Sequence, residues 1–321
     1  MKTKTNNILA LLIIAITIYS CDDILEDNIS DDIISIISPQ ENDVIQGNTV
    51  QFLWNTIEGA DNYTVQVYRS STLVIDSTVT TSPLNLILNS DIYEWRIKGE
   101  NSAYQTQFSF PISFEVETSL DLTNQTVLLN NPSDNLYTND TSFIFTWADI
   151  ESSDSYSFEL VKVSATGNST VHLQDEILTT SYLLDSSIIN EDAEYQWMIK
   201  AVNETSETLF STRTFFIDTV SPSVPSLFTP AFEEEFIIDD TVTFSWGFGT
   251  DTGAIESIIT SVYEIASDDS FITIIESGSS IITNFNFTFD TSGTYYWRVR
   301  GEDEAGNVGT YNLNGKLIVN E

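Results

Sequence analysis

Six tryptophans, arranged as three matched pairs, are the feature of this chain that most constrains its fold. The pairs are Trp54 with Trp95, Trp147 with Trp197, and Trp246 with Trp297. From one pair to the next, the first members are 93 and 99 residues apart and the second members 102 and 100. A repeat of roughly 100 residues is the length of one β-sandwich. The spacing therefore predicts three sandwiches in a row within the 321 residues.

The residues around each tryptophan alternate between apolar and polar side chains. The first member of a pair ends a short run such as Phe52-Leu53-Trp54, and the second lies in a run such as Tyr93-Glu94-Trp95-Arg96-Ile97. Because successive side chains of a strand point to opposite faces, this pattern places the aromatic residues inside and the charged residues outside. The expected core residues are Trp54, Tyr93, Trp95, Trp147, Tyr195, Trp197, Trp246, Tyr295 and Trp297.

Each repeat presents its motifs in one order. Pro39, Pro132 or Pro230 comes first, then the first tryptophan, then an alternating run such as Tyr63-Thr64-Val65, and finally the Tyr-x-Trp run. This order resembles fibronectin type III domains and related bacterial immunoglobulin-like modules. The resemblance implies an all-β chain, with modules at residues 33–118, 119–219 and 220–321. It also implies that the first tryptophan lies on strand B, the alternating run on strand C, and the late tyrosine on strand F as a tyrosine corner.

The amino terminus has the pattern of a secretory signal. Lys2 and Lys4 precede an apolar run from Ile8 to Ile18, which is too short to span a membrane. The sequence Ile18-Tyr19-Ser20-Cys21 resembles a bacterial lipobox. The resemblance implies that residues 1–20 are a signal peptide and that Cys21 carries lipid. The alternative is an ordinary secreted protein in which Cys21 has no such role.

Acidic residues dominate residues 21–32, which read as a flexible tether. Asp22 and Asp23 directly follow the cysteine, and the segment resembles the acidic export signal of surface-exposed lipoproteins of Bacteroidota. We therefore expect an outer-membrane lipoprotein that is exposed at the cell surface. A periplasm-facing protein is the alternative.

The composition excludes several classes of function. Lys and Arg total 11 against 48 Asp and Glu, a formal net charge of −37. Nucleic acid is excluded as a partner, because neutralising phosphates requires clustered basic residues. One cysteine and one histidine provide neither a thiolate metal cluster nor a Ser-His-Asp triad. Hydrolysis by paired carboxylates needs a cleft that three small sandwiches do not offer, so no enzyme is expected.

Two groups of charged residues are candidate sites. Calcium prefers hard oxygen ligands, and five acidic residues lie in loops near the second junction or at the ends of the third repeat: Asp218, Asp239, Asp240, Asp303 and Glu304. No other cofactor is expected. Five basic residues share outward positions on strand F, where they either pair with acidic neighbours or form a ligand-binding stripe: Arg96, Lys98, Lys200, Arg298 and Arg300.

The sequence favours a non-enzymatic spacer, adhesion or protein-interaction module that is anchored to the membrane through Cys21. The alternative is a glycan-binding accessory lipoprotein of a polysaccharide uptake system. Sugars usually dock on exposed aromatic rings, and the core positions occupy every tryptophan. Tyr68, on the outward side of strand C, is the candidate platform residue.

Overall fold

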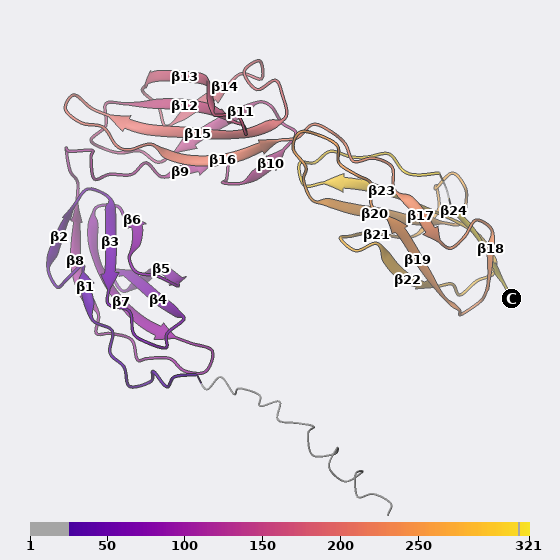
Figure 1. Ribbon diagram of the computed structural model, residues 1–321, viewed down its shortest axis with the longest axis horizontal. Helices are drawn as coiled ribbons and strands as arrows, with labels where there is room; N and C mark the ends of the chain where they lie inside the picture. Colours follow the sequence, from indigo (N-terminus) through magenta and orange to yellow (C-terminus); the bar gives the residue numbers. More distant parts are fainter. Residues whose placement is uncertain (1–25, 314) are drawn as a thin grey trace, which may run out of the picture. The chain divides into compact units, whose positions relative to one another are not determined.

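The computed structural model describes residues 26–313 and 315–321, which form twenty-four β-strands (Figure 1). The strands make six sheets, a three-stranded and a five-stranded sheet in each repeat. The prediction of an all-β chain with three tandem sandwiches is confirmed. The expected signal peptide, residues 1–20, and Cys21 lie outside the described residues. Nowhere in the described part of the chain is there a helix that is long and apolar enough to cross a membrane.

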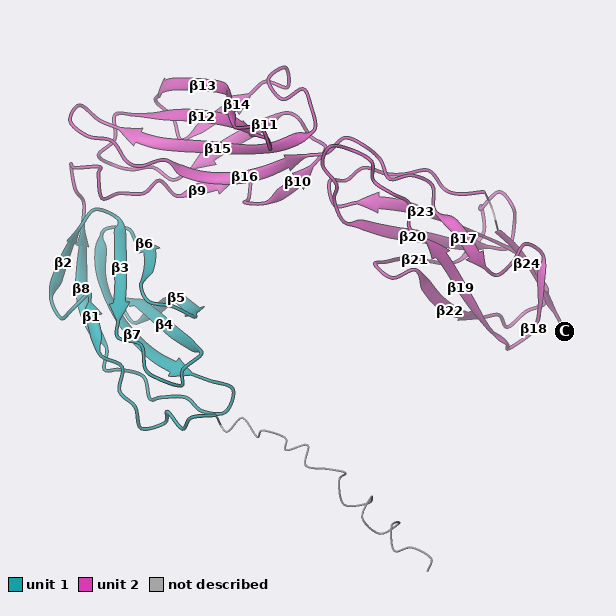
Figure 2. Cartoon of the chain, viewed as in Figure 1, with its two compact units in different colours: residues 1–117 teal, residues 118–321 magenta. Residues whose placement is uncertain are grey.

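The chain divides into two compact units, residues 1–117 and 118–321 (Figure 2). The first unit holds the first module, whose sheets have the strand orders β1-β3-β6 and β2-β8-β7-β4-β5. Its strands are β1 (Ile36–Ser38), β2 (Asp43–Gln46), β3 (Thr49–Trp54), β4 (Asn62–Arg69), β5 (Thr72–Val79), β6 (Leu84–Ile87), β7 (Asp91–Glu100) and β8 (Ile112–Glu117).

The second unit holds two modules with the same arrangement. The second module has the sheets β14-β11-β9 and β10-β16-β15-β12-β13, and the third has β17-β19-β22 and β18-β24-β23-β20-β21. The strands of the second module are β9 (Leu129–Asn131), β10 (Leu136–Thr138), β11 (Phe143–Trp147), β12 (Ser155–Val163), β13 (Ser169–Ile177), β14 (Ser181–Leu184), β15 (Ala193–Val202) and β16 (Ser211–Ile217). Those of the third are β17 (Ser226–Thr229), β18 (Glu234–Ile237), β19 (Thr241–Gly247), β20 (Ile259–Ala266), β21 (Ile274–Ser280), β22 (Asn284–Thr288), β23 (Gly293–Asp303) and β24 (Gly315–Asn320).

The first strand of every module changes sheets at a proline. Before the proline it pairs antiparallel with strand B, as β1 does with β3. After the proline it pairs parallel with the last strand, as β2 does with β8. The prolines are Pro39, Pro132 and Pro230, each following a cis peptide bond. Proline has no backbone N–H to contribute to a ladder, and these edge positions do not require one.

The tryptophan pairs form the centre of each core. The first tryptophan packs on a strand C tyrosine, and the ring centroids of Trp54 and Tyr63 are 5.4 Å apart. The second packs on a strand B phenylalanine, at 4.9 Å between Phe52 and Trp95. The other modules repeat both contacts, and all six tryptophans are at most 2% exposed. Aromatic pairs of this kind add about 0.5–1.5 kcal/mol beyond the burial of their surface.

The strand F tyrosines have the geometry of tyrosine corners. Each hydroxyl donates to the backbone carbonyl oxygen four residues earlier, at 2.9 Å for Tyr93, 3.1 Å for Tyr195 and 2.9 Å for Tyr295. Burial raises the pKa of Tyr195 to about 12, with nearby Glu191 and Asp192 adding to the effect. Its hydroxyl therefore stays protonated and keeps donating at neutral pH.

Part of the expected tether is packed against the first module, which corrects the reading of residues 21–32 as uniformly flexible. Ile29 is 1% exposed, and Asn101 Nδ2 donates to the carbonyl oxygen of Asp27 at 2.9 Å. Ser102 also bonds the Glu26 carboxylate at 2.6 Å. The acidic composition of the segment gave no indication that the Ile29 side chain is buried or that the Asp27 carbonyl oxygen accepts a hydrogen bond.

Candidate functional site

The outward basic residues of strand F are held by partners. Arg298 lies between the rings of Phe271 and Tyr311, 4.0 Å from each centroid, and pairs with Glu264 at 2.6 Å. Lys98, Lys200 and Arg300 form ion pairs of 2.8, 2.7 and 2.6 Å with nearby glutamates. These contacts favour the interpretation as a structural network over a free ligand-binding stripe.

Tyr68 is half-buried and belongs to a similar network. Its hydroxyl donates to Gln66 Oε1 at 2.8 Å, and Arg96 donates to the same oxygen at 2.8 and 3.0 Å. The Arg96 guanidinium also lies 5.2 Å from the Tyr68 ring centroid. The ring and hydroxyl therefore already have protein partners, which leaves little of the open platform that sugar stacking requires.

In the first two modules, an asparagine directly after strand F ties three segments together. Asn101 Nδ2 donates to the carbonyl oxygens of Asp27, at 2.9 Å, and of Gly59, at 2.8 Å. Asn203 Nδ2 makes the equivalent bonds to the carbonyl oxygens of Leu120, at 2.8 Å, and Ser152, at 3.0 Å. Each amide thereby links the F–G turn to the entering segment and to the loop between strands B and C.

The third module has Asp303 at this position, 100 residues after Asn203. A carboxylate cannot donate, and Asn307 supplies the missing N–H groups. Its Nδ2 donates to the Asp218 carbonyl oxygen at 2.8 Å and to Asp303 Oδ2 at 3.0 Å. Asn139, just after β10, donates from its own Nδ2 to Asn307 Oδ1 at 3.1 Å. The F–G turn of the third module is thus bonded to the second module.

Three carboxylates gather at this junction. Asp218 follows β16, Asp251 lies in the loop before β20, and Asp303 ends β23, with one oxygen of each within 4.8 Å of the others. Asp218 is fully buried and Asp303 is 8% exposed. Ser257 donates its hydroxyl to Asp218 Oδ2 at 3.1 Å. We call these three aspartates the junction cluster.

The junction cluster carries negative charge without a basic partner. None of the ion pairs formed within residues 26–313 and 315–321 includes any of its carboxylates. Burial raises the pKa of Asp218 to about 6, and the charges of Asp251 and Asp303 add to that effect. Three close carboxylate oxygens and a hydroxyl are a donor set suited to a hard divalent cation.

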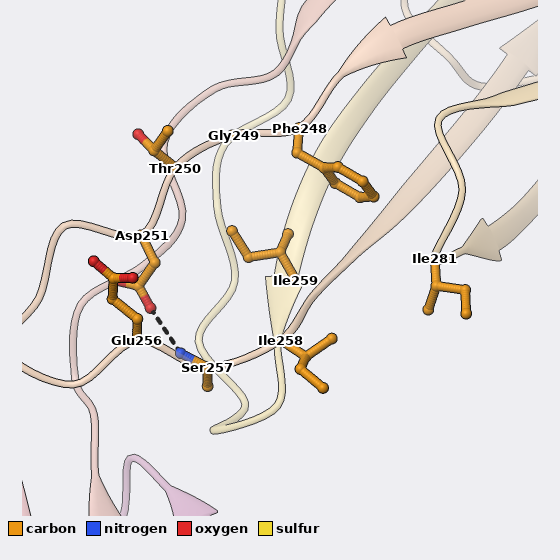
Figure 3. Close-up of a pocket in the computed structure, with 9 residues that line it drawn as sticks. All are labelled: Phe248, Gly249, Thr250, Asp251, Glu256, Ser257, Ile258, Ile259 and Ile281. Atoms are coloured by element: carbon orange, nitrogen blue, oxygen red, sulfur yellow. Dashed lines mark hydrogen bonds between the residues drawn. The ribbon is translucent and has the colours of Figure 1, made fainter.

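A cavity of about 550 Å³ adjoins the junction cluster at Asp251. Figure 3 shows Asp251 and Glu256 at one end of it and the apolar side chains Phe248, Ile258 and Ile281 toward the other. Asp251 Oδ2 accepts the Ser257 backbone N–H at 3.3 Å, which positions this carboxylate. The cavity therefore joins an acidic end to an apolar wall.

Of the five acidic residues expected as calcium ligands, the structure brings together only Asp218 and Asp303. Asp239 and Asp240 lie in the turn before β19, whereas Asp251 follows the other end of that strand. Asp240 Oδ2 instead accepts the Ile237 backbone N–H at 3.1 Å. The remaining candidate, Glu304, is exposed in the F–G turn. Asp251 was missed, although the unusual length of its glycine-containing loop was visible in the sequence.

Comparison with known proteins identifies neither a matching protein-family model nor a matching curated protein. Solved structures of fibronectin type III domains do match. The FN1–FN3 domains of chicken CNTN1 have 16% identity over 89% of this chain and 98% of theirs, with a TM-score of 0.39. The fibronectin(III)-like modules of Clostridium thermocellum CbhA have 14% identity over 58% of this chain and 94% of theirs, with a TM-score of 0.23.

The strand order of each module is that of a fibronectin type III-like sandwich, with strands A, B and E in one sheet and C′, C, F and G in the other, where the second half of strand A (β2, β10 or β18) adds a fifth strand beside G. Function on such a fold is decided by the sites it carries and not by the fold itself.

Proposed function

We propose that this chain is a lipid-anchored, non-enzymatic protein of the bacterial cell envelope that acts as a surface spacer and interaction module. The observation that carries the spacer role is the bonded junction between the second and third modules. Asn139 donates to Asn307 there, and its backbone N–H also bonds the Ala305 carbonyl oxygen at 3.0 Å. Bonds from the turn of one module to its neighbour restrict rotation at the linker, as a semi-rigid spacer requires.

The anchoring is tested by Cys21→Ser. Fractionation of cells that produce the variant is expected to move the protein from the membrane to the soluble fraction, because the variant lacks the thiol that accepts lipid. Ser20→Ala, which keeps a small residue before the cysteine, is the matched control and should remain with membranes. Membrane retention of Cys21→Ser would show that the lipobox reading is wrong.

Surface exposure is tested separately from anchoring. Protease added to intact cells should degrade the protein at the surface, whereas a periplasm-facing protein should be degraded only after the outer membrane is opened. Asp22→Asn with Asp23→Asn removes the acidic export pattern next to Cys21. The double variant is expected to stay anchored and become protected from protease.

Binding of a glycan within an uptake system is the alternative role. Tyr68 remains its candidate residue, but no structural observation favours it over the interaction role. A glycan array probed with the protein is expected to give no specific signal. Specific binding that Tyr68→Ala abolishes would replace the proposed function with this alternative.

Calcium at the junction cluster is our proposal for the cofactor. The support for calcium comes from comparing the three modules. In the first two, an asparagine amide after strand F bonds the neighbouring segments, whereas the third module has three carboxylates at the same place. A divalent cation held by Asp218, Asp251 and Asp303 would bridge the entering segment, the B–C loop and the F–G turn. It would thereby join the B–C loop to the other two segments, as Asn101 and Asn203 do in their modules, while Asn307 bonds the entering segment.

A further inference from the structure

The two sheets of the first module part along one edge, where the first strand changes sheets. Before Pro39 in the sequence, β1 pairs with β3. After it, β2 pairs with β8, and the first residue pair of that ladder is Asp43 with Phe114. Between residues 30–36 and residues 107–112 lies an open cavity of about 750 Å³. We call it the seam groove. Its volume is within the range typical of ligand sites in proteins.

Apolar side chains line the seam groove from both sides. Ile33 on one wall is 87% exposed and Phe110 on the other is 91% exposed. Ile34, Ile36 and Ile112 are more deeply buried and complete the lining. Single exposed apolar residues are common, but these two belong to one groove whose other lining residues include Ile34, Ile36 and Ile112, and apolar surface gathered in this way is typical of interaction sites.

The charge of the seam groove identifies the chemistry of that partner. Asp31, Asp32 and Glu41 line it, and none of the lysines and arginines within residues 26–313 and 315–321 does. Two basic residues stack over Phe108, which also lines the groove, with Arg96 at 4.3 Å and Lys98 at 5.3 Å from the ring centroid. Lys98 pairs with Glu100, whereas Arg96 bonds the neutral side chain of Gln66 and keeps its charge. Because three carboxylates outnumber this one positive charge, the rim of the groove is net negative.

We propose that the seam groove binds an extended segment of a partner protein in which apolar side chains alternate with lysine or arginine. Ile33 and Phe110 clasp the apolar side chains, and Asp31, Asp32 and Glu41 attract the basic ones. This inference rests on the proposed function as an interaction module. It adds to that function a binding site and the chemical character of the partner.

Charge also argues against the other occupants. A second copy of this chain offers only 11 basic residues against 48 acidic ones and is repelled at long range. An anionic lipid surface is repelled by the same rim. Asp22 and Asp23, upstream in the sequence, have the same sign of charge as the rim.

The third module provides a natural control. Its cavity at the equivalent edge, about 430 Å³, is also apolar, and Leu313 there is 94% exposed. Among the residues that the structure describes, none of those lining that cavity is charged. The two grooves thus share their position and apolar character and differ in the acidic rim.

The test uses a short fluorescent peptide of alternating lysine and leucine, with a glutamate–leucine peptide of the same length as control. Anisotropy is measured with the full chain carrying Cys21→Ser, so that no lipid contributes. Because any cationic peptide is attracted to a net charge of −37, the variants decide the outcome. Phe110→Ser is expected to weaken binding about tenfold, the scale of losing one anchoring side chain. Leu313→Ser should leave the affinity unchanged.

Neutralising acidic residues of the rim distinguishes the contribution of charge to peptide affinity from that of apolar contact. Asp31→Asn with Asp32→Asn is expected to weaken binding of the lysine peptide and to reduce its dependence on salt. Thermal unfolding should be the same for all variants, since the changed side chains are exposed. Equal affinity of Phe110→Ser and the parent chain would overturn the proposal.

A membrane role would give a different result. Vesicles of phosphatidylglycerol that sediment the Cys21→Ser chain in a Phe110-dependent manner would assign the groove to lipid and overturn the partner-segment proposal. None of these outcomes affects the fractionation of the Cys21→Ser variant in cells. Failure of the groove proposal is therefore distinguishable from failure of the proposed anchoring.

Discussion

Asn307 donates from Nδ2 to the backbone carbonyl oxygen of Asp218 at 2.8 Å, and this bond closes the entrance to the third module. Asn101 and Asn203 make the equivalent bond in the earlier modules, from a position four residues nearer to the end of strand F. The donor moves in the third module because Asp303 occupies the earlier position. The F–G turn of the third module therefore makes the same bond to the entering segment as the other two, but it carries a carboxylate where they have a neutral amide.

Asn307→Ala should destabilise the third module. The substitution removes the donor to two buried acceptors, the carbonyl oxygen of Asp218 and the carboxylate of Asp303. Leaving buried acceptors unsatisfied costs about 1–3 kcal/mol. Chemical denaturation of the full chain measures the loss, and Asn284→Ala at an exposed position serves as control. If the two variants unfold alike, the bond contributes nothing to the junction.

Removal of calcium should lower the melting temperature of the third module. Without the cation, three carboxylates within 4.8 Å repel one another. A change of 1 kcal/mol corresponds to about 4–8 °C for a domain of 60–100 residues. A chelator added during calorimetry is expected to produce a shift of this size. A melting curve that the chelator leaves unchanged would dismiss the calcium proposal.

Asp303→Asn should abolish the effect of calcium on the third module, because it removes one of the three carboxylates. The variant also turns one oxygen that accepts from Asn307 into an amide donor, so the comparison is between its own melting temperatures with and without calcium. Its response to calcium should disappear. Asp239→Asn is the matched control, because Asp239 lies at the far end of β19 from Asp251 and should leave both measurements unchanged.

Tyr195 should make the second module sensitive to alkaline pH. Its pKa of about 12 is above the value of about 10 for a free tyrosine, so the folded state holds the proton more tightly. The resulting stability is present below pH ~10 and is lost as pH rises toward ~12. Tyr195→Phe should cost about 1 kcal/mol at neutral pH, where the bond to Glu191 is lost.

The same variant should flatten the alkaline dependence, because phenylalanine has no proton to lose. Unfolding free energies measured at neutral pH and in the alkaline range test both effects. A variant as sensitive to high pH as the parent chain would show that other groups control the alkaline transition.

Arg298→Lys should destabilise the third module although the charge is kept. The planar guanidinium stacks between Phe271 and Tyr311, which an ammonium group cannot do equally well. Cation–π contacts are worth about 0.5–2 kcal/mol, depending on how far they are desolvated. Lys316→Ala, which removes the surface pair with Glu233, is expected to have the smaller effect on denaturation.

The tryptophan spacing and the alternation around it predicted the number and type of modules. These features are local: a strand that buries one face must repeat its apolar residues with period two, whatever surrounds it. Tyr93, Trp95 and Ile97 accordingly point into the core, and each is at most 3% exposed. The tyrosine corner was predictable for the same reason, since its acceptor lies only four residues away.

The sequence by itself determined three sandwiches, their core aromatic residues and an acidic surface. Only the tertiary structure decided that Asp251 joins Asp218 and Asp303, because these residues are far apart in the chain and come from a linker, a loop and a strand end. Likewise, only the tertiary structure brought Ile33 and Phe110 to the same groove. The alternation of apolar and polar residues along a strand indicates which of its faces is buried. Which loops come into contact depends instead on how the strands are arranged in the folded chain.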